Sequence, residues 1–210
     1  MKVEIWSDVM CPFCYIGKRK FELALTQYQE NEKVDVIWKS FRLNPSLKTD
    51  PGKNTIQHLA EIKGWTLEHA TEMNNYVTSM AKEVGLTYNL DKAIVANSLD
   101  AHRLSHLAKK YGRQNELEEI LFAAYFTGGK NTADYEILTT IGIDAGLVQE
   151  DIKDMLQSDK FKEEVEQDEN EATKLGIRSV PYFIFNRKYA ISGAQPSNKF
   201  LEILQKIKEE

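Results

Sequence analysis

Two cysteines, Cys11 and Cys14, are the residues of this 210-residue chain best suited to covalent chemistry. They enclose Pro12 and Phe13 in a Cys-Pro-Phe-Cys segment that follows a predicted strand and begins a predicted helix, a context typical of a redox-active dithiol. With Cys11 at the helix N-cap, Pro12 takes the first helical position, where its fixed φ suits the helix and its missing N–H is no loss. The N–H groups and the dipole of that helix end favour a negatively charged sulfur on Cys11.

Cys14 follows one helical turn later, so its side chain shares a face with Cys11 at a separation that a disulfide can bridge. It can therefore resolve a mixed disulfide formed by Cys11. Pro12 and Phe13 carry no charge, which leaves the helix end as the main stabiliser of the thiolate and Phe13 as apolar surface for a substrate. A pair of inert, buried thiols is not expected, because the first turn of a helix is poorly suited to hiding them.

A zinc site is the alternative interpretation of the two cysteines, with His102 and His106 as the other ligands. The long stretch between Cys14 and His102, and the proline between the thiols, are unlike structural zinc motifs. The sequence therefore predicts no metal site. His102 alone is more typical of a packing histidine, although a helix folded over the cysteines could bring Asn97 or His102 to their rim.

Val180 and Pro181 form the second candidate feature, placed immediately before a predicted pair of strands. An X-Pro bond adopts the cis form at modest cost. A cis bond here would turn the backbone of Val180 outward beside the cysteines.

The ends of the chain predict a β-α-β unit and a β-β-α unit around a helical middle, hence an α/β fold. Periodicity predicts strands over residues 2–9 and 34–43, a helix over 11–30, a hairpin over 182–192 with its turn at Asn186-Arg187, and a last helix after Ser197 as N-cap. The middle, about 55–175, has apolar residues at helical spacing throughout, with Ile94 in one stripe and Ser158 capping the last helix. The predicted C-terminal glycines of these helices are Gly85, Gly112 and Gly176.

Composition is that of a folded globular protein, with 42% hydrophobic and 28% charged residues. The net charge of -5 and the lack of a long basic stripe argue against nucleic acid as a partner, and Lys18-Arg19-Lys20 is interpreted as a solvated helix face. No apolar run reaches the roughly 18 to 20 residues that span a bilayer, and the start of the chain resembles no signal peptide. A cytoplasmic protein without membrane attachment is expected.

The residues of three parts of the chain match a known family: Ser7 to Cys14, Asn97 with Ala101 to Leu104, and Gly176 to Pro181 leading to Ile191 to Pro196. On these residues the chain resembles the DsbA-like thioredoxin-fold family and, within it, the FrnE-like branch. The expected layout is a thioredoxin-like domain formed by residues 1–50 and 176–210, interrupted by a large all-helical insertion over 51–175. The resemblance also implies that Cys11 attacks, that Cys14 resolves, and that Pro181 is a cis-proline after a substrate-binding Val180.

The predicted function is thiol-disulfide exchange on protein or small-molecule thiols, with no bound cofactor beyond the Cys11-Cys14 disulfide and with glutathione as a possible co-substrate. Two other functions stay open. A glutathione-dependent isomerase shares the layout but has serine in place of Cys11, and a non-catalytic module could bind peptides by strand addition beside Phe13 and Val180. The direction of electron flow and the oligomeric state do not follow from the sequence, although a cytoplasmic location favours reduction or isomerisation.

Overall fold

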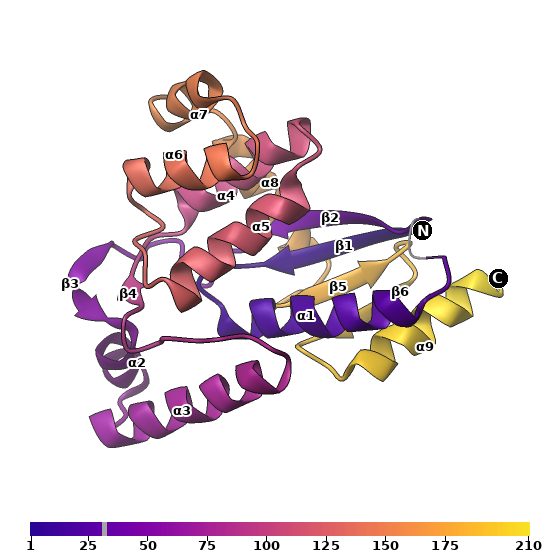
Figure 1. The fold of residues 1–210 in the computed structure, drawn as a ribbon, viewed down its shortest axis with the longest axis horizontal. Helices are drawn as coiled ribbons and strands as arrows, with labels where there is room; N and C mark the ends of the chain where they lie inside the picture. The colour runs from indigo at the N-terminus through magenta and orange to yellow at the C-terminus, as the bar shows by residue number, and fades with distance from the viewer. Residues whose placement is uncertain (31–32) are drawn as a thin grey trace.

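A four-stranded sheet forms the centre of the protein in this computed structural model, which describes residues 1–30 and 33–210. The strand order is β2-β1-β5-β6 (Figure 1). β1 and β2 are parallel, with Ile5 opposite Trp38, whereas β5 is antiparallel to both β1 and β6. The predicted β-α-β and β-β-α units are thereby confirmed. The strands are β1 (Lys2–Ser7), β2 (Asp35–Ser40), β5 (Tyr182–Phe185) and β6 (Tyr189–Ser192).

Helices α1 (Pro12–Gln27) and α9 (Ser197–Lys208) cover one face of the sheet. Alternate residues of a strand point to the same face, so Phe183 and Phe185 both reach this layer. The ring centroids of Phe21 and Phe183 lie 5.7 Å apart, and those of Phe183 and Phe200 lie 4.7 Å apart. This aromatic core fixes α1, and with it the cysteines at its N-terminus, against β5.

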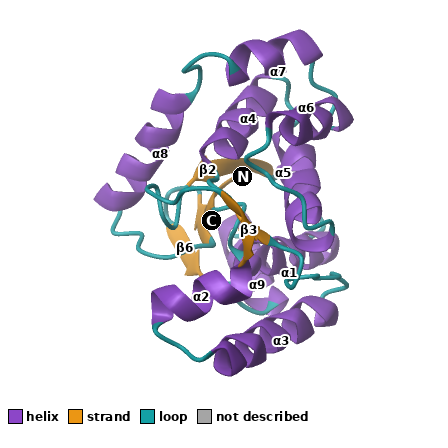
Figure 2. Cartoon of the chain, turned by 90° about the vertical axis from the view of Figure 1, so that its left-hand side faces the viewer, coloured by secondary structure: helices purple, strands orange, loops and turns teal. Residues whose placement is uncertain are grey.

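Helix α8 (Lys162–Lys174) covers the opposite face (Figure 2). The Trp6 indole N–H donates to the backbone oxygen of Asp168 at 3.1 Å, and Lys39 forms an ion pair with the Asp168 carboxylate at 2.7 Å. Both Trp6 and Lys39 are on the side of the sheet turned away from α1. The sheet is therefore buried between two helical layers, as in a thioredoxin-like fold.

The segment between β2 and α8 is a largely helical insertion. It is not all-helical as predicted, because residues 50–54 and 94–95 form a two-stranded sheet, and the predicted bounds of 51–175 stay a prediction. Gly85, Gly112 and Gly176 follow α3 (Leu67–Glu83), α4 (Leu99–Lys110) and α8 with φ values of 79°, 64° and 73°, the left-handed conformation that favours glycine after a helix. The insertion helices are α2 (Thr55–Lys63), α3 (Leu67–Glu83), α4 (Leu99–Lys110), α5 (Gln114–Phe122) continuing as the π-helical η2 (Ala123–Thr127), α6 (Tyr135–Asp144) and α7 (Gln149–Leu156).

Three local predictions are wrong, two in or beside the insertion and one at the start of α9. Ile94 is in a short strand, β4 (Ile94–Val95), that pairs with β3 (Asp50–Asn54), because its partner lies too far along the chain for local periodicity to indicate it. The Ser158 hydroxyl bonds back to the Asp154 carbonyl, and α8 begins only after Phe161. Ser197 is the first residue of α9, and Pro196 is its N-cap.

The Lys18-Arg19-Lys20 run is not a solvated face, contrary to the sequence prediction. Lys18 is only 2% exposed, and its ammonium group lies 2.6 Å from the Glu119 carboxylate and beside that of Glu22. Glu119 belongs to α5, so the charge of Lys18 is neutralised by a helix about a hundred residues away in the chain.

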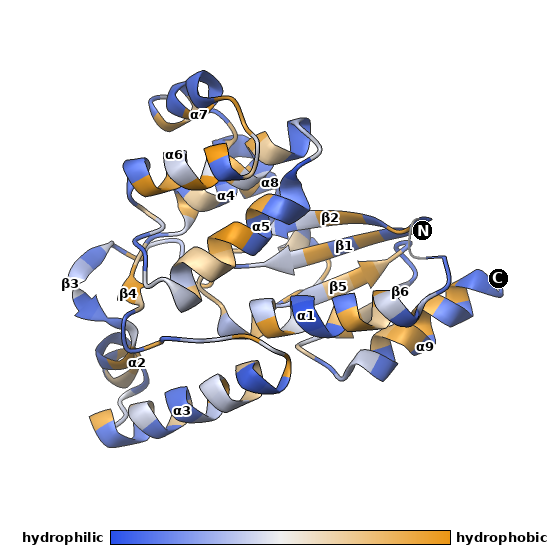
Figure 3. Cartoon of the chain, in the orientation of Figure 1, coloured by the Kyte–Doolittle hydropathy of each residue, from blue (hydrophilic) through white to orange (hydrophobic). Residues whose placement is uncertain are grey.

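Apolar residues are concentrated in the central strands and in stripes along the helices (Figure 3). Within residues 1–30 and 33–210, no helix has both the length and the apolar character required to cross a membrane.

Candidate functional site

The Cys-Pro-Phe-Cys turn joins β1 to α1. Cys11 is the N-cap of α1, with the extended φ and ψ values of −88° and 110°, and Pro12 is at the first helical position, as predicted. The Cys11 N–H donates to the Asp8 carbonyl at 3.0 Å, and the Cys14 N–H donates to the Cys11 carbonyl at 2.9 Å. The first turn of α1 has no acidic residue. No carboxylate of the turn therefore opposes a negative charge on the Cys11 sulfur.

Both cysteines are free thiols and both are buried, contrary to the expectation that the first turn would leave them accessible. Cys11 is 4% exposed and Cys14 is 1% exposed, whereas Phe13 between them is 38% exposed. Segments distant in sequence cover the turn, among them the Tyr88 hydroxyl, which donates to the Pro12 carbonyl at 2.7 Å. A substrate can therefore meet the exposed Phe13 ring before it reaches the Cys11 sulfur.

The Val180-Pro181 peptide bond is cis, as predicted, and it lies beside Cys11. The Cys11 thiol donates to the Val180 carbonyl at a sulfur-oxygen distance of 3.5 Å. The Pro181 carbonyl accepts from the Gly193 N–H at 2.8 Å, which ties the loop before β5 to the end of β6. The backbone of Val180 is thus held next to the reactive sulfur by the strand pair that follows it.

Burial raises the pKa of the Cys14 thiol well above its ordinary value, and the neighbouring Cys11 sulfur raises it further. The Ser7 side chain and the Asp8 backbone act in the opposite direction and lower it. Cys14 is therefore held as a neutral thiol at neutral pH, beside two polar groups that favour its thiolate once it forms.

Asp8 is a site residue to which sequence reasoning assigned no role. Its carboxylate accepts the N–H of Leu43 at 2.7 Å and the N–H of Met10 at 3.3 Å, so it connects the segment after β2 to the loop that leads to Cys11. Ser7 and Asp8, two polar residues at the end of an apolar strand, were the available signal in the sequence for a bonded polar site. Tyr88 was also missed, and no local pattern marks it.

His102 lies beside Asp8 and not beside a sulfur. Its Nε2 is 3.5 Å from the Asp8 carboxylate oxygen, and it is only 3% exposed. Burial by itself raises the pKa of Asp8, but the neighbouring His102 and the N–H groups of Leu43 and Met10 overcome this and lower it below its usual value. The Asn97 amide donates to the Leu47 carbonyl in the β2–β3 connection at 2.7 Å, and its oxygen accepts from the N–H of Leu99, the first residue of α4, at 2.9 Å.

His106, the other histidine of the zinc alternative, is directed away from the cysteines. Its Nε2 lies 3.1 Å from the Ser40 hydroxyl and 3.2 Å from the Asp168 carboxylate. Across the described parts of the chain, no three histidine, cysteine, aspartate or glutamate side chains are grouped closely enough to hold a metal ion.

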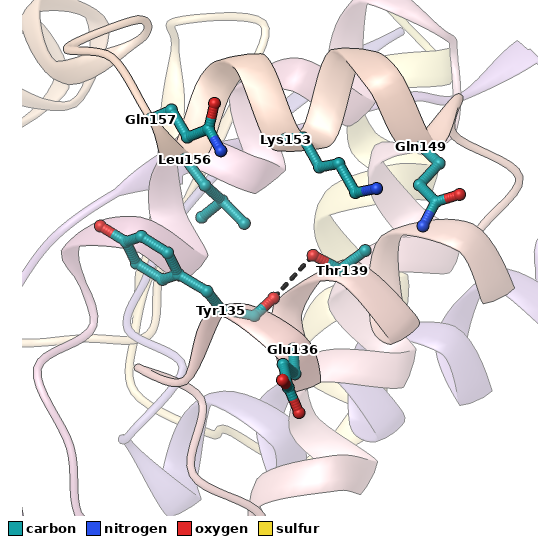
Figure 4. Close-up of a pocket in the computed structure, with 7 residues that line it drawn as sticks. All are labelled: Tyr135, Glu136, Thr139, Gln149, Lys153, Leu156 and Gln157. Atoms are coloured by element: carbon teal, nitrogen blue, oxygen red, sulfur yellow. Dashed lines mark hydrogen bonds between the residues drawn. The ribbon is translucent and has the colours of Figure 1, made fainter.

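A separate groove lies between α6 and α7 (Figure 4). The Thr139 hydroxyl on its floor bonds to the Tyr135 carbonyl of its own helix at 2.6 Å. The groove contains neither cysteine and shares no lining residue with the turn at Cys11, so no chemistry is assigned to it. Its lining residues are Tyr135, Glu136, Thr139, Gln149, Lys153, Leu156 and Gln157.

Comparison with known proteins gives concordant results. Residues 2–205 match the model of the DSBA-like thioredoxin domain. The crystal structure of a probable DsbA oxidoreductase from Streptomyces coelicolor superimposes with a TM-score of 0.94 at 34% identity, covering 100% of this chain and 91% of that one. The cytosolic disulfide reductase DsbM from Pseudomonas aeruginosa, solved with GSH, has a TM-score of 0.70 at 15% identity, with complete coverage of both chains.

A curated relative, the protein YwbO of Bacillus subtilis, is 27% identical over 184 residues, which are 87% of this chain and 85% of that protein. The FrnE-like branch stays a prediction, because none of these matches is specific to it. The family model and the 34% identical structure together cover nearly the whole chain, including the strand-turn-helix unit that bears both cysteines. The chain therefore belongs to the DSBA-like thioredoxin domain family of disulfide oxidoreductases.

Proposed function

We propose that this protein is a thiol-disulfide oxidoreductase that cycles Cys11 and Cys14 between the dithiol and the disulfide. One observation carries the proposal. The Cys11 sulfur is at the N-cap of α1 and 3.5 Å from the carbonyl of Val180, the residue before cis-Pro181, with Cys14 one turn behind it. This arrangement combines a stabilised thiolate, a backbone edge for a substrate and a resolving thiol.

Cys11 starts the reaction in the reductive direction. Its thiolate attacks one sulfur of a substrate disulfide, the S–S bond of the substrate breaks, and the second substrate sulfur leaves as a thiolate that takes a proton from water. A Cys11 thiolate has no proton to donate, so the Val180 carbonyl loses its partner and can accept a backbone N–H of the substrate. Val180 and Pro181 then position the substrate, while Pro12 and the exposed ring of Phe13 supply apolar contact.

Cys14 completes the cycle. It must first lose its proton, which its raised pKa opposes and which the Ser7 side chain and the Asp8 backbone assist. The Cys14 thiolate attacks the Cys11 sulfur, the mixed disulfide breaks, and the substrate leaves as a dithiol that has gained two electrons, while Cys11 and Cys14 are oxidised to a disulfide. The reverse sequence oxidises a substrate dithiol. Which direction prevails depends on the reduction potential of this pair.

Glutathione is the proposed small-molecule co-substrate, because the structurally similar DsbM is a disulfide reductase solved with GSH. Thiols and disulfides of proteins are the other proposed substrates, and a cytoplasmic location, as in that reductase, favours reduction and isomerisation over net oxidation. We assign Asn97 and His102 no direct contact with the substrate, since their side chains are bound to the β2–β3 connection and to Asp8.

The test is to trap the mixed disulfide. Cys14→Ala is incubated with a peptide disulfide and analysed by intact mass spectrometry, with Cys11→Ala and wild type as controls. We expect a stable adduct on Cys14→Ala, no adduct on Cys11→Ala, and turnover without accumulation for wild type. An adduct on Cys11→Ala, or none on either variant, contradicts the mechanism. Glutathione-dependent isomerisation that survives Cys14→Ala would support the isomerase, and binding without turnover by wild type would support the peptide-binding module.

A further inference from the structure

Gly17 is where helix α1 touches the loop of the cis-proline. A Cβ added to Gly17 would lie 2.8 Å from Cγ of Pro181, 3.5 Å from Cζ of Phe183 and 3.6 Å from Cα of Ala194. The first distance is shorter than real Cβ contacts allow. Gly17 is buried in the middle of α1, where glycine lowers helix stability relative to alanine. Its place in the helix interior therefore calls for a reason in the packing around it.

Pro181, the nearest neighbour of Gly17, cannot easily move away from the helix. The Pro181 ring is closed on its own backbone, and its carbonyl is bonded to the Gly193 N–H at 2.8 Å. The residue after Gly193, Ala194, accepts a hydrogen bond at its carbonyl from the Lys20 ammonium on α1 at 3.0 Å. Helix α1 thus contacts the cis-proline loop directly at Gly17 and, one turn later, holds the adjoining segment after β6 by the hydrogen bond from Lys20 (Figure 1 shows α1 beside β5 and β6). The bond from the Gly193 N–H to the Pro181 carbonyl joins these two segments.

The cis-proline loop before β5 carries the Val180 carbonyl, which lies 3.5 Å from the Cys11 sulfur. Cys11 and Gly17 are both fixed to α1, and Val180 and Pro181 are adjacent across one peptide bond. Any displacement of Pro181 away from α1 therefore moves the Val180 backbone relative to the sulfur. The size of the side chain at position 17 therefore sets the distance between the Cys11 sulfur and the Val180 backbone, where substrate exchange is proposed to occur.

We infer that Gly17 is a positioning residue of the active site, and that the absence of its side chain sets the distance between the Cys11 sulfur and the substrate-binding backbone at Val180. This rests on the proposed function. Gly17 touches neither sulfur, so it acts only through Pro181. The effect is confined to substrates with a peptide backbone, because a small disulfide reagent has no N–H to place against the Val180 carbonyl.

The test compares Gly17→Ala with wild type on two substrates, a disulfide-bonded peptide and a small aromatic disulfide reagent. Displacement of a reacting pair by about 1 Å costs about a hundredfold in rate, so for the smaller displacement expected here peptide exchange should slow about tenfold. Attack on the small reagent should change by less than about twofold, because the helix end that stabilises the thiolate is intact. The decisive readout is the ratio of the two rates, which a general loss of stability does not change.

Gly142→Ala is the matched control. A Cβ at this second buried helical glycine would lie 2.6 Å from Cδ1 of Ile152, between α6 and α7 and away from the cysteines. It introduces comparable crowding, and we expect both exchange rates, per folded molecule, to stay at the wild-type value. A peptide-to-reagent ratio that falls in Gly142→Ala as much as in Gly17→Ala would overturn the inference.

Lys20→Met keeps the inference testable if Gly17→Ala does not fold. This variant removes the hydrogen bond to Ala194 without adding a Cβ against the loop, and it should slow peptide exchange about twofold to threefold, the effect of losing one partly exposed hydrogen bond. Lys20→Arg, which retains a donor, should restore the rate. Unchanged peptide exchange in Lys20→Met together with a non-folding Gly17→Ala, or wild-type exchange in a folded Gly17→Ala, would refute the role of Gly17. Absence of exchange in wild type would instead refute the proposed function.

Discussion

The turn at Cys11 and a cluster of polar side chains on and beside α4 are both largely buried, but their polar atoms are bonded differently. We call the second region the α4 cluster. Its members are paired with one another by short hydrogen bonds, such as Ser105 to Glu118 at 2.6 Å and Lys39 to Asp168 at 2.7 Å. The α4 cluster consists of Lys39, Ser40, Ser105, His106, Gln114, Glu118 and Asp168.

The cysteine turn has weaker and fewer side-chain bonds. The Cys11 thiol has one long hydrogen bond, at 3.5 Å to a backbone carbonyl, and burial disfavours the charged form of Cys14. Burial therefore serves two ends in this protein. A fully paired buried network holds the sheet to the helices, whereas the buried cysteine pair has few partners, which suits the changes of charge and covalent state that the proposed mechanism requires.

Replacing the nucleophile should separate the two regions most clearly. Cys11→Ser puts a hydroxyl that stays protonated in place of the thiol, and it should reduce the rate of exchange with a peptide disulfide by at least about a thousandfold. The variant should unfold in denaturant at nearly the wild-type midpoint, since the hydrogen bond from the Cys11 thiol to Val180 is long and weak. Residual exchange within a factor of ten of wild type would place the nucleophile elsewhere and remove the contrast between the two regions.

The next effect is on stability alone. Asp168→Ala leaves His106 without its carboxylate, the Ser40 N–H without an acceptor and Lys39 with only Glu171, at 3.0 Å, as an ion-pair partner. Removing one partner of a buried network of this kind costs about 3 kcal/mol or more of unfolding free energy. Exchange per folded molecule should not change. Denaturant unfolding and the peptide assay, performed on the same preparation, give the two values.

Glu118→Gln is the control for the loss of a carboxylate in the same cluster. Burial raises the pKa of Glu118, so its charged form is the costly one, and glutamine retains an acceptor for the Ser105 hydroxyl. The free energy of unfolding at pH 7 should stay within about 1 kcal/mol of wild type or rise. A loss equal to that of Asp168→Ala would show that the two carboxylates are not distinguished by pairing.

Acid should weaken both regions through carboxylates whose pKa values are lowered in the folded state. For Asp168, burial raises the pKa, but hydrogen bonds from His106 and Lys39 overcome this and lower it, and Asp8 is lowered in the same way by His102. Such groups stabilise the fold fully above the unfolded value of 3.8, and this contribution is lost as the pH falls through the lower folded values. The midpoint of denaturant unfolding should therefore drop below about pH 4.

Asp168→Asn provides the check on the acid effect. Its unfolding free energy should depend less steeply on pH below about 4 than that of wild type, because one of the responsible carboxylates is absent. A pH dependence identical to that of wild type would assign the acid sensitivity to other groups.

A hydrogen bond from Tyr88 joins the cysteine turn to the insertion, and its loss should have a smaller effect. Tyr88→Phe removes the hydroxyl that donates to the Pro12 carbonyl, which should cost about 1 kcal/mol of unfolding free energy. Because the turn then opens more readily, alkylation of Cys11 at a fixed pH should accelerate, by at most about fivefold. Slower alkylation would show that Tyr88 favours the thiolate instead of covering it.

Much of the site was readable from the sequence because it is local. A strand followed by Cys11, with Pro12 at the first helical position and Cys14 one turn later, forms from neighbouring residues alone, and the structure has these residues at the predicted positions. The hairpin before α9 was readable for the same reason, since Asn186 and Arg187 adopt the positive φ values of a tight turn.

Other features were not readable, because their partners are far away in the chain. Ile94 pairs across a gap of about forty residues with the strand that begins at Asp50, and a helical stripe predicted from its neighbours could not reveal this. Lys18 is a charged residue of a type that usually faces solvent, but in the structure it is buried and forms an ion pair with Glu119 of α5. No sequence pattern around Tyr88 indicated that its hydroxyl would bond to the cysteine turn.

The pair of thiols at Cys11 and Cys14, and the strand-turn-helix unit that presents it, follow from the order of residues alone. Hydrogen bonding and φ preferences within a few residues decide such a unit. The folded chain was needed to learn how far the sulfurs are buried, which side chains of the insertion cover them, and that Gly17 meets Pro181. Burial and close approach are sums over contacts between distant segments, and those contacts exist only once the chain has folded.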